Sequence, residues 1–176
     1  DAQGNAGEAN SLRVVSLEHK MGLHASPTAV MEYDGATGWL VGQEHGGMAA
    51  MFTMMNNARL GVGVQGIGIA EGAFQHALSS APDRKPGGKG AILEHADVRR
   101  MLTEMKADTF AARAIALACG VAIDMSSATH DDAWTARAAF LTPIAKAFGT
   151  DVGVDVASTG VQVHGGMGYI EETGAA

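Results

Sequence analysis

A run of 34 residues without proline, from Met48 to Ala81, limits the fold of this chain more than any other feature. Apolar residues recur along it at spacings of three and four, at Met48, Met51, Phe52, Met55, Ile67, Ala70, Phe74 and Leu78. This spacing predicts one long helix with an apolar face. We expect the helix to end near Pro82, because proline lacks an N–H group and disfavours helical geometry in the residue before it.

Glycines are unusually frequent inside this predicted helix, with five between Gly61 and Gly72. Each costs about 1 kcal/mol relative to alanine in a helix interior. The string GVGVQG, from Gly61 to Gly66, matches the GxGxxG pattern of dinucleotide-binding folds. That pattern works only between a strand and the start of a helix, with an acidic residue about 20 positions later. Here it falls in mid-helix, so we interpret the glycines as points where another helix or a ligand approaches the backbone.

The first 45 residues have a different pattern. Ser11–Leu17 and Thr28–Tyr33 are short runs rich in β-forming residues, with turn-prone sequence between them. Two or three strands are only marginally stable by themselves in water. We therefore predict that residues 1–45 are the last strands of a larger β domain.

Residues 46–176 are expected to be helical throughout. A second helix is predicted at about Ala91 to Met125 and a third from Asp131 or Asp132 up to Gly165 and Gly166, with a kink at Pro143. The apolar face of the second helix is assigned to Val98, Met101, Leu102, Met105, Phe110 and Ile115. Long helices with short connections predict a mainly α fold, an antiparallel up-and-down bundle. We expect it to be incomplete, with its last helix beyond Ala176 or supplied by another subunit.

Composition narrows the possible functions. The net charge is −7 and the 12 lysines and arginines form no basic stripe, which argues against a nucleic-acid surface. The single cysteine, Cys119, allows no disulfide and is expected to be a buried spectator in a reducing, cytoplasmic setting. The apolar run Leu60–Ala70 is shorter than the roughly 20 residues of a membrane span. The seven histidines show no i, i+4 pair, so no metal site is predicted.

Two strings carry polar groups that suggest binding. Asn56 and Arg59 lie one helical turn apart among methionines. In such apolar surroundings the guanidinium of Arg59 is expected to be paired or to face a ligand, and this interpretation is favoured over a solvated polar stripe. In QVHGGMGY, Gly165 and Gly166 expose backbone N–H groups to a phosphate or an aromatic ring, and Gln162 adds a donor and an acceptor. An ordinary helix C-cap followed by a turn explains the second string equally well.

Several strings in order resemble the acyl-CoA dehydrogenase family, a family of flavoenzymes. They are EHKMGLHASPT, LVGQEHGGMAAMFTMMNNARL, the DRKPGG loop, HADVRRMLTEMKA and QVHGGMGYIEE, which together span residues 11–172. The resemblance points most closely to a bacterial branch that handles unusual or longer acyl chains. It implies strands of a middle β domain followed by a C-terminal helical bundle. The implied reaction is α,β-dehydrogenation of an acyl-CoA thioester, in which a glutamate removes the α proton and FAD accepts the β hydride.

The resemblance also implies roles for single residues. Arg59 would support the catalytic end of the cleft, while Met55 and Asn56 would line the acyl and pantetheine channel. The diphosphate and adenosine part of FAD would be met by Arg84, Gln162, Gly165 and Gly166. Implied partners are the acyl-CoA substrate, an electron-transfer flavoprotein and further copies of the chain, in a dimer or tetramer.

The usual catalytic glutamate of the family lies in a YEGT-like string, which we expect beyond Ala176. A minority of members place the base on the long helix, where this chain has Ala58. Glu171 and Glu172 are not assigned as base. With Asp1 as its first residue, the chain is interpreted as a piece of a longer protein, inactive and unable to retain FAD alone. An acyl-CoA oxidase and a non-catalytic helical oligomerisation module are the alternatives.

Overall fold

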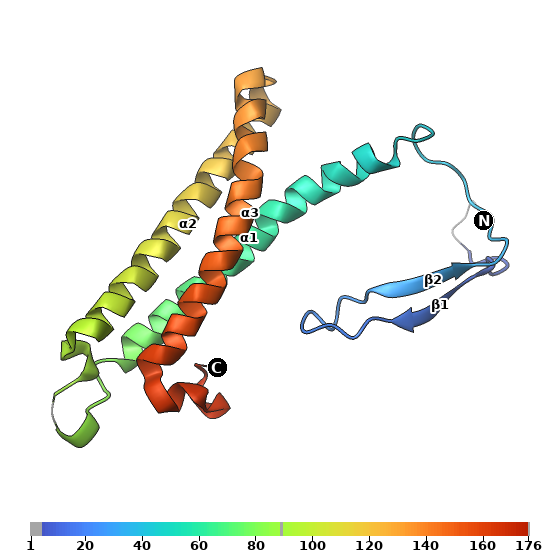
Figure 1. The fold of residues 1–176 in the computed structure, drawn as a ribbon. Helices are drawn as coiled ribbons and strands as arrows, with labels where there is room; N and C mark the ends of the chain where they lie inside the picture. Colours follow the sequence, from blue (N-terminus) through green and yellow to red (C-terminus); the bar gives the residue numbers. More distant parts are fainter. Residues whose placement is uncertain (1–4, 89, 176) are drawn as a thin grey trace. The chain divides into compact units, whose positions relative to one another are not determined.

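The computed structural model describes residues 5–88 and 90–175 (Figure 1). The chain divides into two compact units, Asp1–Met48 and Ala49–Ala176. The first contains a hairpin of β1 (Leu12–Leu17) and β2 (Ala29–Tyr33), which are antiparallel with Leu12 opposite Tyr33 and a bulge between Val14 and Ser16. Both strands agree with the predicted ones to within a residue. Every residue of β1 is exposed, including its valines and leucines.

The second unit is built on three long helices, α1 (Gly47–Ser80), α2 (Ala96–Thr129) and α3 (Asp132–His164). Short turns of 3-10 helix lie between α1 and α2, at η1 (Pro86–Gly88) and η2 (Ile92–Glu94), and after α3, at η3 (Gly165–Tyr169) and η4 (Glu171–Thr173). Figure 1 shows α2 and α3 side by side and antiparallel, with α1 crossing α3. The prediction of a mainly helical, antiparallel fold is confirmed.

The tight link between α2 and α3 follows from two residues. His130 adopts left-handed geometry (φ 54°), and its N–H donates to the carbonyl of Ser126 at 3.0 Å. Asp131 then caps α3, because its carboxylate accepts the N–H of Ala133 at 2.8 Å. The chain therefore reverses direction between α2 and α3 within two residues. The N-cap, predicted at Asp131 or Asp132, is Asp131.

Some helix boundaries differ from the predictions. α2 starts at Ala96 instead of Ala91, since η2 occupies the intervening segment, and it ends at Thr129 instead of Met125. α3 continues through Pro143 as one helix from Asp132 to His164, so no turn interrupts it there. Proline removes one backbone hydrogen bond. Thr142 and Ala145, on either side of this position, are buried in the bundle.

The core lies where the three helices meet. Its largest members include Ile67 from α1, Leu102 and Met105 from α2, and Val152 and Val156 from α3. The expected apolar face of α1 is only partly correct: Ile67 and Ala70 are buried, whereas Met48, Met51, Phe52 and Leu78 are exposed. On α2 the assignment of Phe110 is wrong, because its side chain is 69% exposed. Thr109 takes the buried position and donates its hydroxyl hydrogen to the carbonyl of Met105 at 2.7 Å.

The close approach expected at the α1 glycines is confirmed, and the occupant is a helix. A Cβ atom placed on Gly66 would lie 2.2 Å from the carbonyl oxygen of Gly149 in α3, and one on Gly63 would lie 2.7 Å from that of Ala145. Gly153, one turn after Gly149 on α3, also meets Gly66: a Cβ atom on Gly153 would lie 2.8 Å from the carbonyl oxygen of Gly66. The GxGxxG string is therefore a helix-crossing surface, and the dinucleotide interpretation fails as expected.

One helix in the described part of the chain, α2, is long and apolar enough to cross a membrane by length and composition, with 28% of its most apolar window buried. The expectation based on Leu60–Ala70 overlooked this helix. α2 packs along α3 (Figure 1) and buries a continuous line of small and apolar residues from Leu102 through Ala112 to Ala122. Such a line is what a core helix of a bundle requires.

Candidate functional site

The predicted polar cluster on α1 opens onto a cavity between all three helices. Arg59 is half-buried, its Nη1 lies 3.4 Å from Oδ1 of Asn56, and its Cζ lies 5.8 Å from the ring centroid of Phe52. The cavity has a volume of about 570 Å³. Asn56 and Arg59 both line it, together with Thr53, Asn57, Ile123, Ser126, Ser127, Thr135, Ala138, Ala139, Thr142 and Pro143.

Met55 is half-buried in the same helix and stands outside the set of described residues that line this cavity. The two serines, the threonines and Asn56 give the walls hydroxyl and amide groups, while Ile123, Pro143 and the alanines give apolar surface. A pocket with mostly apolar walls and a few polar groups is typical of a site for an amphipathic organic ligand. Ala58 is exposed and carries no ionisable group, so α1 offers no carboxylate at that position.

A second predicted cluster forms where α1 and α3 end. Arg84 follows α1 in sequence, and its Nη1 donates to the carbonyl oxygen of His164, the last residue of α3. Its guanidinium also borders Gly165, where a Cβ atom would lie 2.9 Å from Nη1. Gly165 has φ 61°, a left-handed value that favours glycine. The fold therefore brings together Arg84 and Gly165, which are far apart in the sequence.

The remaining members of this cluster are accessible. Gln162, Gly165 and Gly166 are exposed, and nothing described lies within 4 Å of a Cβ placed on Gly166. A guanidinium next to an open glycine turn suits a diphosphate, because it supplies charge-assisted N–H donors and the turn admits close approach to the backbone. One N–H of Arg84 is used by His164, and the guanidinium keeps further donors for an anion. The residues present thus fit the diphosphate part of a flavin dinucleotide.

Sequence reasoning missed two histidines in this region. His76 and Ser80 lie one turn apart on α1 and reach toward His164, whose ring stacks on that of His76 with centroids 4.7 Å apart and planes 19° apart. The Nε2 atom of His164 lies 3.1 Å from the hydroxyl oxygen of Ser80. The i, i+4 spacing of His76 and Ser80 was the available signal. It carries little weight without the partner from α3, which only the fold provides.

Ionised side chains elsewhere on the helices form pairs. Glu71 of α1 accepts hydrogen bonds from Gln75 at 2.7 Å and from Arg113 of α2 at 2.6 Å. These bonds, together with the positive charge of Arg113, hold the pKa of Glu71 below its ordinary value of 4.5. Arg100 is paired with Asp97 and Glu104 on the surface of α2. Among the described residues, no group of three or more His, Cys, Asp or Glu side chains is arranged to hold a metal ion.

Cys119 is buried as expected, with its Sγ 3.5 Å from the hydroxyl oxygen of Thr142. Glu171 and Glu172 are exposed on η4. Neither carboxylate makes a described hydrogen bond to the polar residues of the two clusters. Nothing in their positions therefore assigns them a catalytic role.

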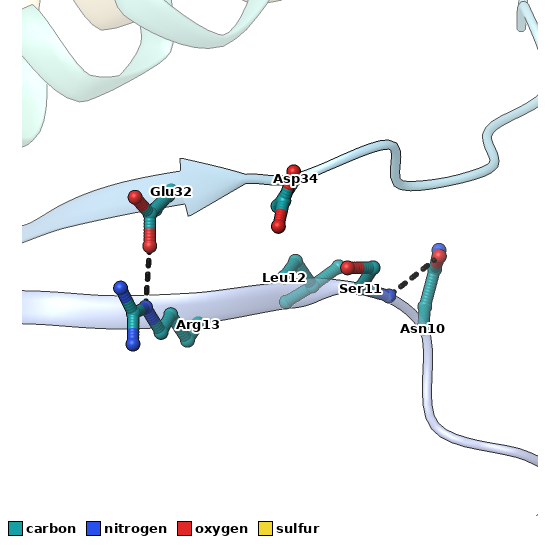
Figure 2. A pocket seen from close by; sticks show the side chains of 6 residues that line it. All are labelled: Asn10, Ser11, Leu12, Arg13, Glu32 and Asp34. Atoms are coloured by element: carbon teal, nitrogen blue, oxygen red, sulfur yellow. Dashed lines mark hydrogen bonds and ion pairs between the residues drawn. The ribbon is translucent and has the colours of Figure 1, made fainter.

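The hairpin unit has a polar hollow of its own, with a volume of about 320 Å³. Figure 2 shows Arg13 of β1 directed toward Glu32 of β2, and Asn10 accepting the N–H of Ser11 at 3.0 Å. Asn10 also exchanges two hydrogen bonds with the backbone of Thr37, at 2.7 and 2.9 Å. The ion pair is exposed on both sides, so this hollow is a solvated surface that fixes the ends of the hairpin.

Comparison with known proteins agrees with the resemblance. The family model for the C-terminal domain of acyl-CoA dehydrogenases matches residues 45–176. The chain is 52% identical to 3-methylmercaptopropionyl-CoA dehydrogenase of Ruegeria pomeroyi, over 98% of this chain and 31% of that protein. It is 34% identical to a butyryl-CoA dehydrogenase of Syntrophomonas wolfei, over 96% of this chain and 31% of that protein. The expected resemblance to a bacterial branch of acyl-CoA dehydrogenases is confirmed by these relatives.

The fold is also found in solved structures. The structure of ACDH-11 of Caenorhabditis elegans in complex with C11-CoA matches 99% of this chain and 29% of that one, with a TM-score of 0.84 and 26% identity. The chain spans about a third of the length of the curated relatives it matches. Sequence, family model and fold agree, and the chain belongs to the acyl-CoA dehydrogenase family.

Proposed function

We propose that this chain supplies the C-terminal part of the substrate and flavin sites of an acyl-CoA dehydrogenase. The observation that carries the proposal is the meeting of Arg84 with the Gly165 turn at the end of α3, in a chain that belongs to this family. FAD, when bound, would supply the acceptor for the hydride that leaves the β carbon of the acyl chain. Arg84 and the open turn at Gly165 and Gly166 would hold its diphosphate, and Gln162 would face its adenosine part.

The cavity at Asn56 and Arg59 is proposed as the place of the acyl-CoA thioester. Its hydroxyl and amide groups suit the pantetheine portion, and its apolar walls suit an acyl chain. Arg59 would orient the reacting end, and Met55 would border the channel from α1. The proton from the α carbon would go to a glutamate outside these 176 residues. Electrons would then pass to an electron-transfer flavoprotein, in an oligomer of a cytoplasmic enzyme.

A chimera with the Ruegeria relative tests the proposal. Residues 1–176 replace the matching segment of that dehydrogenase, and FAD content and acyl-CoA-dependent reduction of an artificial electron acceptor are measured. We expect bound FAD and dehydrogenation. Replacing Arg84 with alanine in the chimera should remove most of the FAD, whereas replacing Arg100, an exposed arginine paired on the surface of α2, should not. A chimera that is folded and oligomeric but free of FAD would refute the proposal and favour the oligomerisation module.

The same chimera separates dehydrogenase from oxidase. An acyl-CoA oxidase passes the electrons to oxygen, so peroxide would form in air without an added acceptor. We expect little peroxide and efficient transfer to an electron-transfer flavoprotein. Peroxide formed in proportion to the substrate consumed would instead assign the chain to the oxidases.

A further inference from the structure

The stacked pair of His76 and His164 joins three segments that are distant in the sequence. His164, only 7% exposed, places Nδ1 at 2.8 Å from the carbonyl oxygen of Gly160 and Nε2 at 3.1 Å from the hydroxyl of Ser80. His76 places its Nε2 at 2.9 Å from the carbonyl oxygen of Thr173 in η4. The pair therefore links the end of α1 to the end of α3 and to the segment that follows it.

The partners of the rings determine where the hydrogens lie. A backbone carbonyl only accepts hydrogen bonds, so Nδ1 of His164 and Nε2 of His76 must each carry a hydrogen. Each imidazole thus donates to a fixed carbonyl, and the rings also contact each other face to face. This arrangement restricts both rings to one orientation and one tautomer in their neutral forms.

The turn at Gly165 and Gly166 is held on both sides by these contacts. On its N-terminal side, Arg84 donates to the carbonyl of His164. On its C-terminal side, Thr173 donates its hydroxyl hydrogen toward the carbonyls of Met167 at 2.9 Å and Ile170 at 2.7 Å, which closes η3 and η4 into a compact unit. The bond from His76 to the carbonyl of Thr173 attaches that unit to α1.

We propose that His76 and His164 are positioning residues for the glycine turn: they attach residues 165–175 to α1 and so fix the direction in which the turn presents its backbone to a diphosphate. The role of the diphosphate rests on the proposed function, whereas the attachment does not. His76 does not contact the ligand in this proposal, because its Nε2–H group already donates to the carbonyl oxygen of Thr173. Its effect on a cofactor is transmitted through the backbone of the turn.

Amide hydrogen exchange of the 176-residue chain tests the attachment. His76→Phe keeps a flat ring for stacking and loses the donor, while His76→Gln keeps an N–H group near the position of Nε2 and loses the ring. We expect His76→Phe to speed exchange at the amides of Ile170, Thr173 and Gly174 about five- to tenfold, since it removes one hydrogen bond. His76→Gln should restore part of the protection. His95→Phe, at an exposed histidine before α2, is the matched control.

Two results would overturn the attachment. One is unchanged exchange at residues 170–174 in His76→Phe. The other is an equal rise at the core amides of α2, which would show general destabilisation instead of local release. Nitrogen-15 NMR of the histidine rings gives an independent readout: we expect the Nε2–H tautomer for His76 and the Nδ1–H tautomer for His164. The opposite tautomer of His76 would contradict the bond to Thr173.

The chimera with the Ruegeria relative then tests the link to the cofactor. FAD affinity, measured by quenching of flavin fluorescence, should fall about tenfold in His76→Phe and recover in part in His76→Gln. Unchanged affinity in His76→Phe, with faster exchange at residues 170–174, would refute the positioning role and leave the proposed function intact. A chimera that binds no FAD even with His76 present refutes the proposed function, and the exchange experiment still decides the attachment.

Discussion

The crossing of α1 and α3 gives the sharpest test of the fold, through the substitution Gly66→Ala. A Cβ atom at this position would lie 2.2 Å from the carbonyl oxygen of Gly149 and 2.9 Å from the Cα of Thr150. Both are backbone atoms of a regular helix, which no rotamer change can move. The two helices must therefore separate by roughly 1 Å, which loosens the core around Ile67 and Val152.

The expected change in the free energy of unfolding follows from two opposing effects of the added methyl group. Alanine in place of glycine favours the helix by about 1 kcal/mol. Forcing an extra methyl group into a packed interface costs typically about 1–3 kcal/mol and more where backbone must move. At Gly66 we expect net destabilisation of about 1–2 kcal/mol. Gly68 is the matched control in the same helix, because nothing described lies within 4 Å of its Cβ position. Gly68→Ala should therefore stabilise the chain by about 0.5–1 kcal/mol.

Urea denaturation followed by circular dichroism at the helix band measures both variants. The two should differ by roughly 1.5–3 kcal/mol in free energy of unfolding, which corresponds to about 3–12 °C in Tm. If Gly66→Ala is as stable as Gly68→Ala, the helices are not in backbone contact at this crossing and the account of the α1 glycines is wrong.

Three further predictions concern single contacts. Hydrogen bonds from Gln75 and Arg113 lower the pKa of Glu71, so the contact stabilises the folded chain above about pH 4.5 and is lost as the pH falls through the lowered pKa. Glu71→Gln should therefore cost about 0.5–1 kcal/mol near neutral pH, and its cost in urea titrations should shrink progressively as the pH is lowered below about 4.5. A cost that does not change with pH would contradict this. Asp131→Ala removes the N-cap of α3 and should lower stability by about 1 kcal/mol, with Asp131→Asn as the variant that should retain most of it. Met105→Ala, at a side chain only 1% exposed, should cost about 2–5 kcal/mol by the same measurement, and a cost below 1 kcal/mol would contradict its place in the core.

Local sequence patterns predicted the helices and strands well and the faces of the helices less well. Period and capping signals are local, so they placed α1, the N-cap at Asp131 and both strands close to their observed bounds. The side chain of Phe110 was placed inside because it is apolar, yet Thr109 occupies the buried position. A threonine can be buried there because its hydroxyl bonds to the carbonyl one turn earlier, which hydrophobic spacing does not reveal.

The residues of the candidate sites also divide into those that local sequence patterns revealed and those that only the fold brought together. Asn56 and Arg59 were found because they are neighbours on one helix, and Gly165 and Gly166 because adjacent glycines are conspicuous. The contact of Arg84 with the end of α3 and the stack of His76 on His164 depend on how α1 and α3 cross. The roles in binding FAD and acyl-CoA remain predictions, which the chimera is designed to test.

By itself the sequence determined that a long, glycine-rich helix organises the chain, that the GxGxxG string in it is not a nucleotide fingerprint, and which family the chain resembles. Only the tertiary structure decided which glycines matter. Gly63 and Gly66 face the backbone of α3, whereas Gly61, Gly68 and Gly72 have open space around them. The physical reason is that the cost of a glycine is local and can be read from the sequence, while its benefit arises from a second helix, whose position depends on the packing of the whole bundle.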